Sequence, residues 1–183
     1  MANQEQLTLL LNQGVEAWNQ WRREHPEIEV DLNEADLSGA TLERANLNEA
    51  KLSRATLIGA TLNGAGLFRA SLDRAKLDAA HLDMADLVDP ADLTEASITG
   101  ASFVGASLIG AILQSADLSG ANFSGANLNS AHLEFSNLSG ANLSGANLSD
   151  ANLSAIGLTQ EQLNTAASLH HTIMPDGSLH DGE

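Results

Sequence analysis

The stretch Ser139–Asp150 reads SGANLSGANLSD and repeats every five residues. A half-buried β-strand has a period of two residues and an α-helix a period of 3.6, so neither explains this repeat. A five-residue unit fits one short extended side followed by one tight bend. Four such sides close a square coil of twenty residues, and stacked coils pair through parallel backbone hydrogen bonds about 4.8 Å apart. The stretch therefore predicts a solenoid in which each coil contacts only its neighbours.

The same period runs through most of the chain. Large apolar residues recur every five positions from Leu32 to Leu87 and, after one six-residue step, from Leu93 to Leu153. An alanine stands two residues before nearly every one of these apolar centres. In each of the 25 units the small and the large residue are expected to point inward, while the other three are polar or turn residues. The array predicts an all-β solenoid filled by its own Ala and Leu side chains.

The A-[DN]-L-x-x pattern, as in ADLSGANFSGANLNSAHL at residues 116–133, resembles the pentapeptide repeat family. The resemblance covers roughly residues 30–157 and implies a right-handed quadrilateral parallel β-helix of about six coils. The handedness rests on the resemblance, because the five-residue spacing does not determine it. The family is abundant in cyanobacteria, and most of its members have no known biochemical role.

The twenty-residue coil makes a direct prediction about the interior. Phe103 and Phe123 are both apolar centres and are twenty residues apart, so their rings should stack. The six-residue step falls at residues 88–90, where Pro90 has no backbone N–H and cannot join the ladder. We expect the extra residue to bulge at a corner.

Acidic residues gather around this step, and we weighed them as a calcium site. They are Asp78, Asp83, Asp86, Asp89, Asp92 and Glu95. The five-residue spacing distributes several of them over different sides of the coil, which gives a partial ring rather than a cage of oxygen ligands. The sequence therefore predicts no metal site here.

Both ends of the solenoid should be capped, because open coils expose unpaired edges. Residues 1–29 are predicted to form an α-helical cap, and its helix is expected to end near Pro26. The apolar residues with helical spacing are Leu7, Leu11, Val15 and Trp18. The repeat array is assigned to residues 30–157.

Residues 158–183 are predicted to form a short helix and a tail. Thr159 and Gln162 have the spacing of a capping box, and the helix is expected to continue to about Ser168. The tail contains three apolar residues that form a candidate contact: Leu169, Ile173 and Met174. The resemblance implies that some members form end-to-end dimers through such an element. The same residues could equally fold back onto the last coil.

The charge distribution restricts the classes of partner. The formal net charge is −16, which argues against direct binding to a nucleic-acid backbone. All eight Lys and Arg lie at or before Lys76, and thirteen acids follow that residue. There is no cysteine, and the sequence shows neither a secretory signal nor a membrane-spanning run. These features predict a cytoplasmic protein that does not bind membranes.

No set of residues predicts catalysis. The sequence lacks a phosphate-binding loop, a zinc-protease motif and a nucleophile elbow. His170, His171 and His180 match no structural metal motif. We therefore predict no catalytic, cofactor-binding or metal-binding residue, and we do not expect an enzyme.

Outward apolar residues are the strongest indication of function. Phe68, Val88 and Ile109 each follow an apolar centre on successive coils of one side, and Val104 lies on the adjacent side. Contiguous apolar patches usually mark contacts, although scattered surface hydrophobes are common. We interpret these four residues as a candidate interaction patch.

The preferred hypothesis is a non-enzymatic scaffold that presents a rigid surface to a protein partner, with a second copy of itself as one possibility. The resemblance also implies an alternative, since some members mimic duplex DNA and modulate a type II topoisomerase such as gyrase. The net charge fits mimicry. Its distribution fits less well, because only Asp117 and Glu134 are acidic between Ser97 and Ser149. A metal-binding or enzymatic protein is the third reading.

Overall fold

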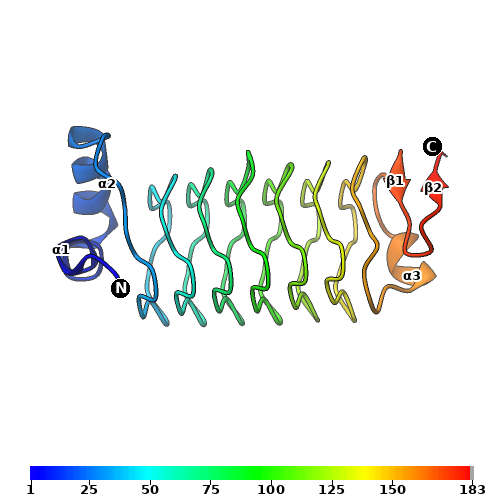
Figure 1. Ribbon diagram of the computed structural model, residues 1–183, viewed down its shortest axis with the longest axis horizontal. Coiled ribbons are helices and arrows are strands. Elements are labelled where there is room, and N and C mark those ends of the chain that lie inside the picture. Colours follow the sequence, from blue (N-terminus) through cyan, green and yellow to red (C-terminus); the bar gives the residue numbers. More distant parts are fainter. Residues whose placement is uncertain (182–183) are drawn as a thin grey trace.

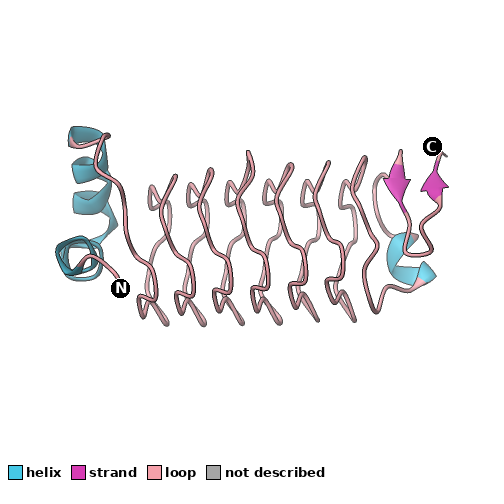
Figure 2. Ribbon diagram, viewed as in Figure 1, coloured by secondary structure: helices cyan, strands magenta, loops and turns pink. Residues whose placement is uncertain are grey.

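Residues one coil apart lie directly above one another in the computed structural model, which describes residues 1–181 (Figure 1). Parallel bridges join positions twenty apart, as between Asp31 and Lys51, and 21 apart across the insertion, as between Ser71 and Asp92. Each side of a coil contributes only an isolated bridge, so the sides are drawn as loops in Figure 2. The twenty-residue coil predicted from the sequence is confirmed.

The backbone hydrogen bonds show how a five-residue unit is built. Along a side, the Leu42 N–H donates to the Thr61 carbonyl at 2.7 Å, and the Thr61 N–H donates to the Ala40 carbonyl at 2.9 Å. At the corner, the Ala45 N–H donates to the Leu42 carbonyl at 3.0 Å, and Arg44 between them has a φ of 57°. This combination is typical of a type II turn. Sides and corners thus pair their backbone groups, as a buried backbone requires.

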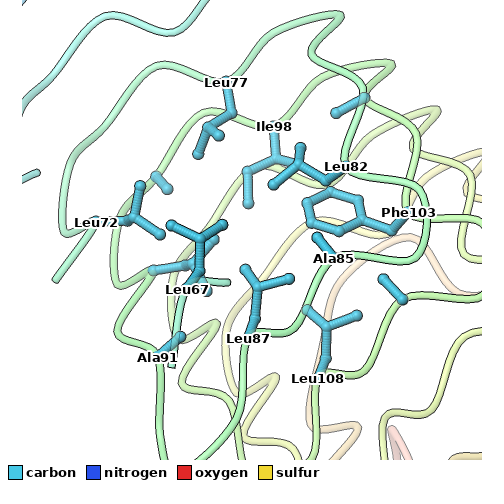
Figure 3. Packing of buried hydrophobic residues seen from close by; sticks show 14 of the residues in the cluster. Leu67, Leu72, Leu77, Leu82, Ala85, Leu87, Ala91, Ile98, Phe103 and Leu108 are labelled. Atoms are coloured by element: carbon cyan, nitrogen blue, oxygen red, sulfur yellow. The ribbon is translucent and has the colours of Figure 1, made fainter. Parts of the chain in front are cut away.

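The interior is filled by the alanine and leucine columns. The large centres from Leu32 to Leu153 are almost completely buried. The Phe103 and Phe123 rings stack with centroids 5.1 Å apart and an interplanar angle of 17°, which confirms the predicted pair. Figure 3 shows Phe103 pointing into this interior close to Leu82 and Ile98.

The six-residue step lies at a corner, as expected. The Leu87 N–H donates to the Ser107 carbonyl at 2.8 Å, and the Asp92 N–H donates to the Ala70 carbonyl at 2.9 Å. The ladder therefore continues on both sides of the extra residue, and Pro90 is exposed.

The N-terminal segment is not the single helix that the apolar spacing predicted. It contains α1 (Gln4–Thr8), a π-helix η1 (Leu9–Gln13) and α2 (Gly14–Glu24). Gly14 has a φ of 83°, which glycine adopts at little cost, and the chain changes direction there. Leu11, expected on the buried face, is consequently 43% exposed.

Polar side chains join these helices to the first coil. The Trp18 indole N–H donates to the Asn46 carbonyl at 2.9 Å, and Trp18 is fully buried. The Gln6 side-chain oxygen accepts from the Asp31 N–H at 2.8 Å. The Asn19 side-chain oxygen accepts from the Asn46 N–H at 2.7 Å. Backbone groups left open at the edge of the first coil thus find side-chain partners.

At the other end, α3 (Gln160–Leu163) is shorter than predicted. The capping box formed by Thr159 and Gln162 is present. The helix stops at Leu163 rather than near Ser168, because the chain turns back to the ladder and the Ala167 N–H donates to the Ala146 carbonyl at 2.8 Å.

The predicted tail continues the coil, which is the alternative in which its apolar residues fold back onto the last coil. Ser168 and Ile173 form parallel bridges with residues of the last regular coil. β1 (Thr172–Ile173) also pairs with the antiparallel β2 (Leu179–His180). Thr172 is fully buried and donates its hydroxyl to the Leu148 carbonyl at 2.7 Å.

None of the helices within residues 1–181 has the length and apolar content that a membrane-spanning segment needs.

Candidate protein-interaction surface

The structure brings three of the four candidate patch residues into one column. The Arg69 N–H donates to the Val88 carbonyl at 3.1 Å, which places Phe68 and Val88 on successive coils. The Leu87 N–H donates to the Ser107 carbonyl, which places Ile109 next to Val88 on the following coil. Ile109 is 40% exposed, whereas Phe68 and Val88 are half-buried. We call Phe68, Val88 and Ile109 the apolar strip.

A basic side chain covers part of the apolar strip. The Arg69 guanidinium lies 5.0 Å from the centroid of the Phe68 ring. It also forms an ion pair with Asp89 at 2.9 Å, and its Nε donates to the Asp89 carbonyl at 3.2 Å. A cation over an aromatic face is attracted by the ring quadrupole. A partner that uses Phe68 would therefore have to stack beside Arg69 or displace it.

Val104 lies on the neighbouring side and belongs to a different column. The Met84 N–H donates to the Val104 carbonyl at 2.9 Å. The Met84 side chain is 70% exposed and its sulfur lies over Gly105, where an added Cβ would come within 2.6 Å of it. The sequence reading missed Met84, although the twenty-residue register places its corner one coil from Gly105.

The C-terminal candidate residues are divided between the interior and the surface. Leu169 and Met174 pack against the core, and Ile173 points outward. The Leu153 N–H donates to the Ile173 carbonyl at 2.8 Å, which fixes this segment on the last coil. A hollow of about 410 Å³ remains at this end, lined partly by Leu158, Leu163, Met174 and Leu179.

The acidic residues around the insertion are mostly occupied by their own neighbours. Asp78 accepts from the Ser97 hydroxyl at 2.5 Å, and Glu95 pairs with Arg74 at 2.8 Å. Asp92 accepts from Thr94 in the same way. Within residues 1–181, no group of three or more His, Asp or Glu is placed to hold a metal ion.

Asp117 is a carboxylate held by hydrogen bonds on the surface. Bonds from the Ser119 hydroxyl and backbone, together with one from Asn137 at 3.1 Å, lower the pKa of Asp117. A lowered folded-state pKa contributes stability above the unfolded pKa, and this contribution is lost as the pH falls through the folded value. Serine hydrogen bonds lower the pKa of Asp36 and Asp176 similarly.

We therefore expect Asp117→Asn to melt below the wild type at pH 7, with a difference that disappears in acid. Below the ordinary aspartate pKa of about 3.9, both proteins carry an uncharged side chain at this position once the folded-state pKa is passed. The measurement is the melting temperature of both proteins from pH 7 to pH 2. Asp86→Asn is the control, because its carboxylate accepts no side-chain bond within residues 1–181. A difference that persists unchanged in acid would contradict the account.

The comparisons with known proteins agree with this architecture. The family described as Pentapeptide repeats matches the chain in eight copies over residues 28–65, 91–125 and 126–155, which is more than half of its length. No curated protein matches the sequence. Its solved neighbours include a trypsin-treated form of QnrB1, a plasmid-mediated fluoroquinolone resistance protein. That structure has a TM-score of 0.65 and 19% identity, over 78% of this chain and 76% of that chain.

Two cyanobacterial structures are also similar. HetL, a pentapeptide repeat protein involved in heterocyst differentiation regulation in Nostoc sp. strain PCC 7120, is 31% identical over 84% of this chain and 90% of that chain, with a TM-score of 0.34. Rfr23 from Cyanothece 51142 is 25% identical over 73% and 95% of the two chains, with a TM-score of 0.40. With its five-residue period, twenty-residue coil and aliphatic interior, the chain belongs to the pentapeptide repeat family, whose fold is the right-handed quadrilateral β-helix.

Proposed function

We propose that the protein is a non-enzymatic interaction scaffold whose apolar strip binds a protein partner. The observation that carries the proposal is the alignment of Phe68, Val88 and Ile109 on three successive coils. Most other outward positions are Ser, Asn, Thr, Asp or Gly, so a stacked apolar column stands out from this surface. Contiguous apolar patches of this kind usually mark contacts.

The shape of the molecule supports a surface function. The interior is filled by its own alanine and leucine columns. Hollows of about 410 and 480 Å³ lie at the two ends, next to the terminal segments. The sides of the coils are held by a continuous ladder, so the backbone that carries the strip needs no rearrangement, and a partner has only to stack beside the Arg69 side chain or displace it. Preorganised surfaces lose little conformational entropy on binding.

The double substitution Phe68→Asp/Ile109→Asp is expected to weaken capture of the partner by about tenfold or more, because central apolar contacts dominate interface energies. The measurement is affinity capture from cell extract with quantitative mass spectrometry, which names the partner and compares its recovery between variants. Ser124→Asp/Ser144→Asp is the matched control, since these residues occupy the same unit position on another side. Equal recovery by the strip variant and the control would contradict the proposal.

A second candidate function is modulation of a type II topoisomerase by DNA mimicry. The net charge of −16 favours it. The fold is similar to that of QnrB1, a fluoroquinolone resistance protein, and this similarity is the second argument for it. The first coils, however, carry Arg and Lys on their surface, as in the Arg74–Glu95 pair, which interrupts a continuous negative stripe. A gyrase supercoiling assay tests this function directly: inhibition or protection at micromolar protein supports it, and no effect removes it.

We also infer that the terminal segments cap a stack of about six coils. At the C-terminal end, a second copy is a candidate partner, because Leu179 is 55% exposed beside the 410 Å³ hollow. Light scattering during size-exclusion chromatography distinguishes a monomer from a dimer. A dimer that Leu179→Asp dissociates supports this contact, and a monomer at all concentrations rules it out.

A further inference from the structure

One unit in the C-terminal half departs from the repeat at four neighbouring positions. In the same frame the surrounding units read NLSGA or close variants, whereas residues 132–136 read HLEFS. His132 stands where Asn is usual, Glu134 where Ser is usual and Phe135 where Gly is usual. Ser136 replaces the inward alanine and satisfies its hydroxyl by donating to the Leu133 carbonyl at 2.7 Å. We call residues 132–136 the HLEFS corner.

Phe135 combines an unfavourable backbone conformation with an exposed ring, and neither feature stabilises the fold. Its φ is 62°, the left-handed region that is unfavourable for a bulky side chain, and its surface is 74% exposed. The Phe135 N–H donates to the Ser154 carbonyl at 2.8 Å, so the residue lies at a corner, in register with Ala155 on the following coil. On the preceding coil the equivalent corner residue is Ser115. Neither small neighbour covers the ring.

Glu134, the residue before Phe135, carries a largely buried carboxylate. Its Oε1 accepts from the Asn152 side chain at 3.0 Å and lies 3.4 Å from Nδ1 of His132. The side chain is only 17% exposed, and Oε2 is buried without a hydrogen-bond partner within residues 1–181. A carboxylate oxygen in that position is costly unless a donor reaches it.

Within residues 1–181, the basic side chain that reaches Glu134 is His132, at Oε1, and no Lys or Arg reaches Oε2. All its Lys and Arg lie at or before Lys76, more than fifty residues before the HLEFS corner. The combination of an open aromatic face, a carboxylate and a surplus of negative charge matches one side chain best. The guanidinium group of arginine is planar, stacks on aromatic rings and donates in parallel to a carboxylate.

We infer that the HLEFS corner binds an arginine side chain of a partner protein, with the guanidinium stacked on Phe135 and donating to Glu134. The terminal torsion of a glutamate is soft, so either oxygen can turn toward an arriving donor. Asn152 and His132 then orient the carboxylate. This inference does not depend on the apolar strip, which lies on another side of the coil.

The test is an NMR titration of the full-length protein with N-acetyl-arginine amide. Saturable shifts are expected for the Phe135 ring and for the amides of residues 132–136. N-acetyl-citrulline amide has the same shape without the charge, and it should bind at least about tenfold more weakly at matched ionic strength. Glu134→Gln and Phe135→Gly should each weaken arginine binding by about tenfold.

Matched variants separate this site from general electrostatics. Glu161→Gln removes an exposed carboxylate elsewhere, and Ser130→Gly makes a comparable change at the preceding corner, where φ is 57°. Both should leave the titration unchanged. Phe135→Gly also suits the left-handed backbone, so the variant is expected to remain folded. Equal shifts with citrulline, no shifts at residues 132–136, or unchanged binding by Glu134→Gln would overturn the inference.

Discussion

Replacing Phe103 with alanine is expected to lower the free energy of unfolding by about 3–5 kcal/mol, the range for a buried aromatic residue. Phe103 is completely buried, and its ring stacks on that of Phe123 at 5.1 Å. Each coil encloses a narrow interior, and its backbone is tied to the coils above and below. The cavity left by the ring therefore cannot close by a simple collapse of the side chains around it.

Urea denaturation followed by circular dichroism measures this loss. Ile58→Ala is the control, because Ile58 is an outward residue whose truncation should change stability by only about 0.5 kcal/mol. Phe123→Ala should be as costly as Phe103→Ala, since each removes one member of the same stack. A loss for Phe103→Ala no larger than that for Ile58→Ala would show that the ring is not enclosed by the coil.

Replacing Trp18 with alanine is the second change with a large expected effect. Trp18 is fully buried between α2 and the first coil, and its indole N–H donates to the Asn46 carbonyl. Removing a buried tryptophan costs about 3–5 kcal/mol. Because the helices cover the open edge of the first coil, their loss should also expose strand edges that pair with other molecules. We expect a lower melting temperature together with aggregation.

Light scattering and thermal melting together measure this result. Trp18→Phe retains most of the packing and removes the indole donor, so its loss should be about 0.5–1.5 kcal/mol beyond the change in ring size. Aggregation by Trp18→Ala but not by Trp18→Phe would support capping by the helices. A Trp18→Ala protein that stays monomeric with an unchanged melting temperature would contradict it.

The regular part of the fold could be predicted from the sequence because each five-residue unit carries the same information. The spacing determines which residues point inward, and the twenty-residue coil then determines the Phe103–Phe123 pair. The same register placed Phe68, Val88 and Ile109 in one column. These are consequences of a repeated geometry and need no knowledge of individual side-chain conformations.

The ends were harder, because there the repeat signal is short or interrupted. Ala167 with Leu169 and Thr172 with Met174 do follow the small-x-large spacing, but the helix α3 separates them from the array and threonine replaces one alanine. The polar contacts of Gln6 with the first coil depend on where the helices lie, which the apolar spacing did not determine.

The surface could be predicted only to the level of columns. The register puts Arg69 between Glu49 on one coil and Asp89 on the next. In the structure the Arg69 side chain extends over the Phe68 ring and forms its ion pair with Asp89. The unusual composition of the HLEFS corner is visible in the sequence. The Glu134 oxygen that lacks a partner among residues 1–181 is not visible there, because it depends on the positions of Asn152 and His132.

The central claim is that four five-residue sides make one turn, so that residues twenty apart are stacked. The most direct test is the pattern of nuclear Overhauser effects between aromatic rings in solution, since the chain has only four phenylalanines. The account predicts contacts between the ring protons of Phe103 and Phe123, whose centroids are 5.1 Å apart. It predicts none between either ring and Phe135, which is on the outer surface. An absence of contacts between Phe103 and Phe123, or contacts of either with Phe135, would contradict it.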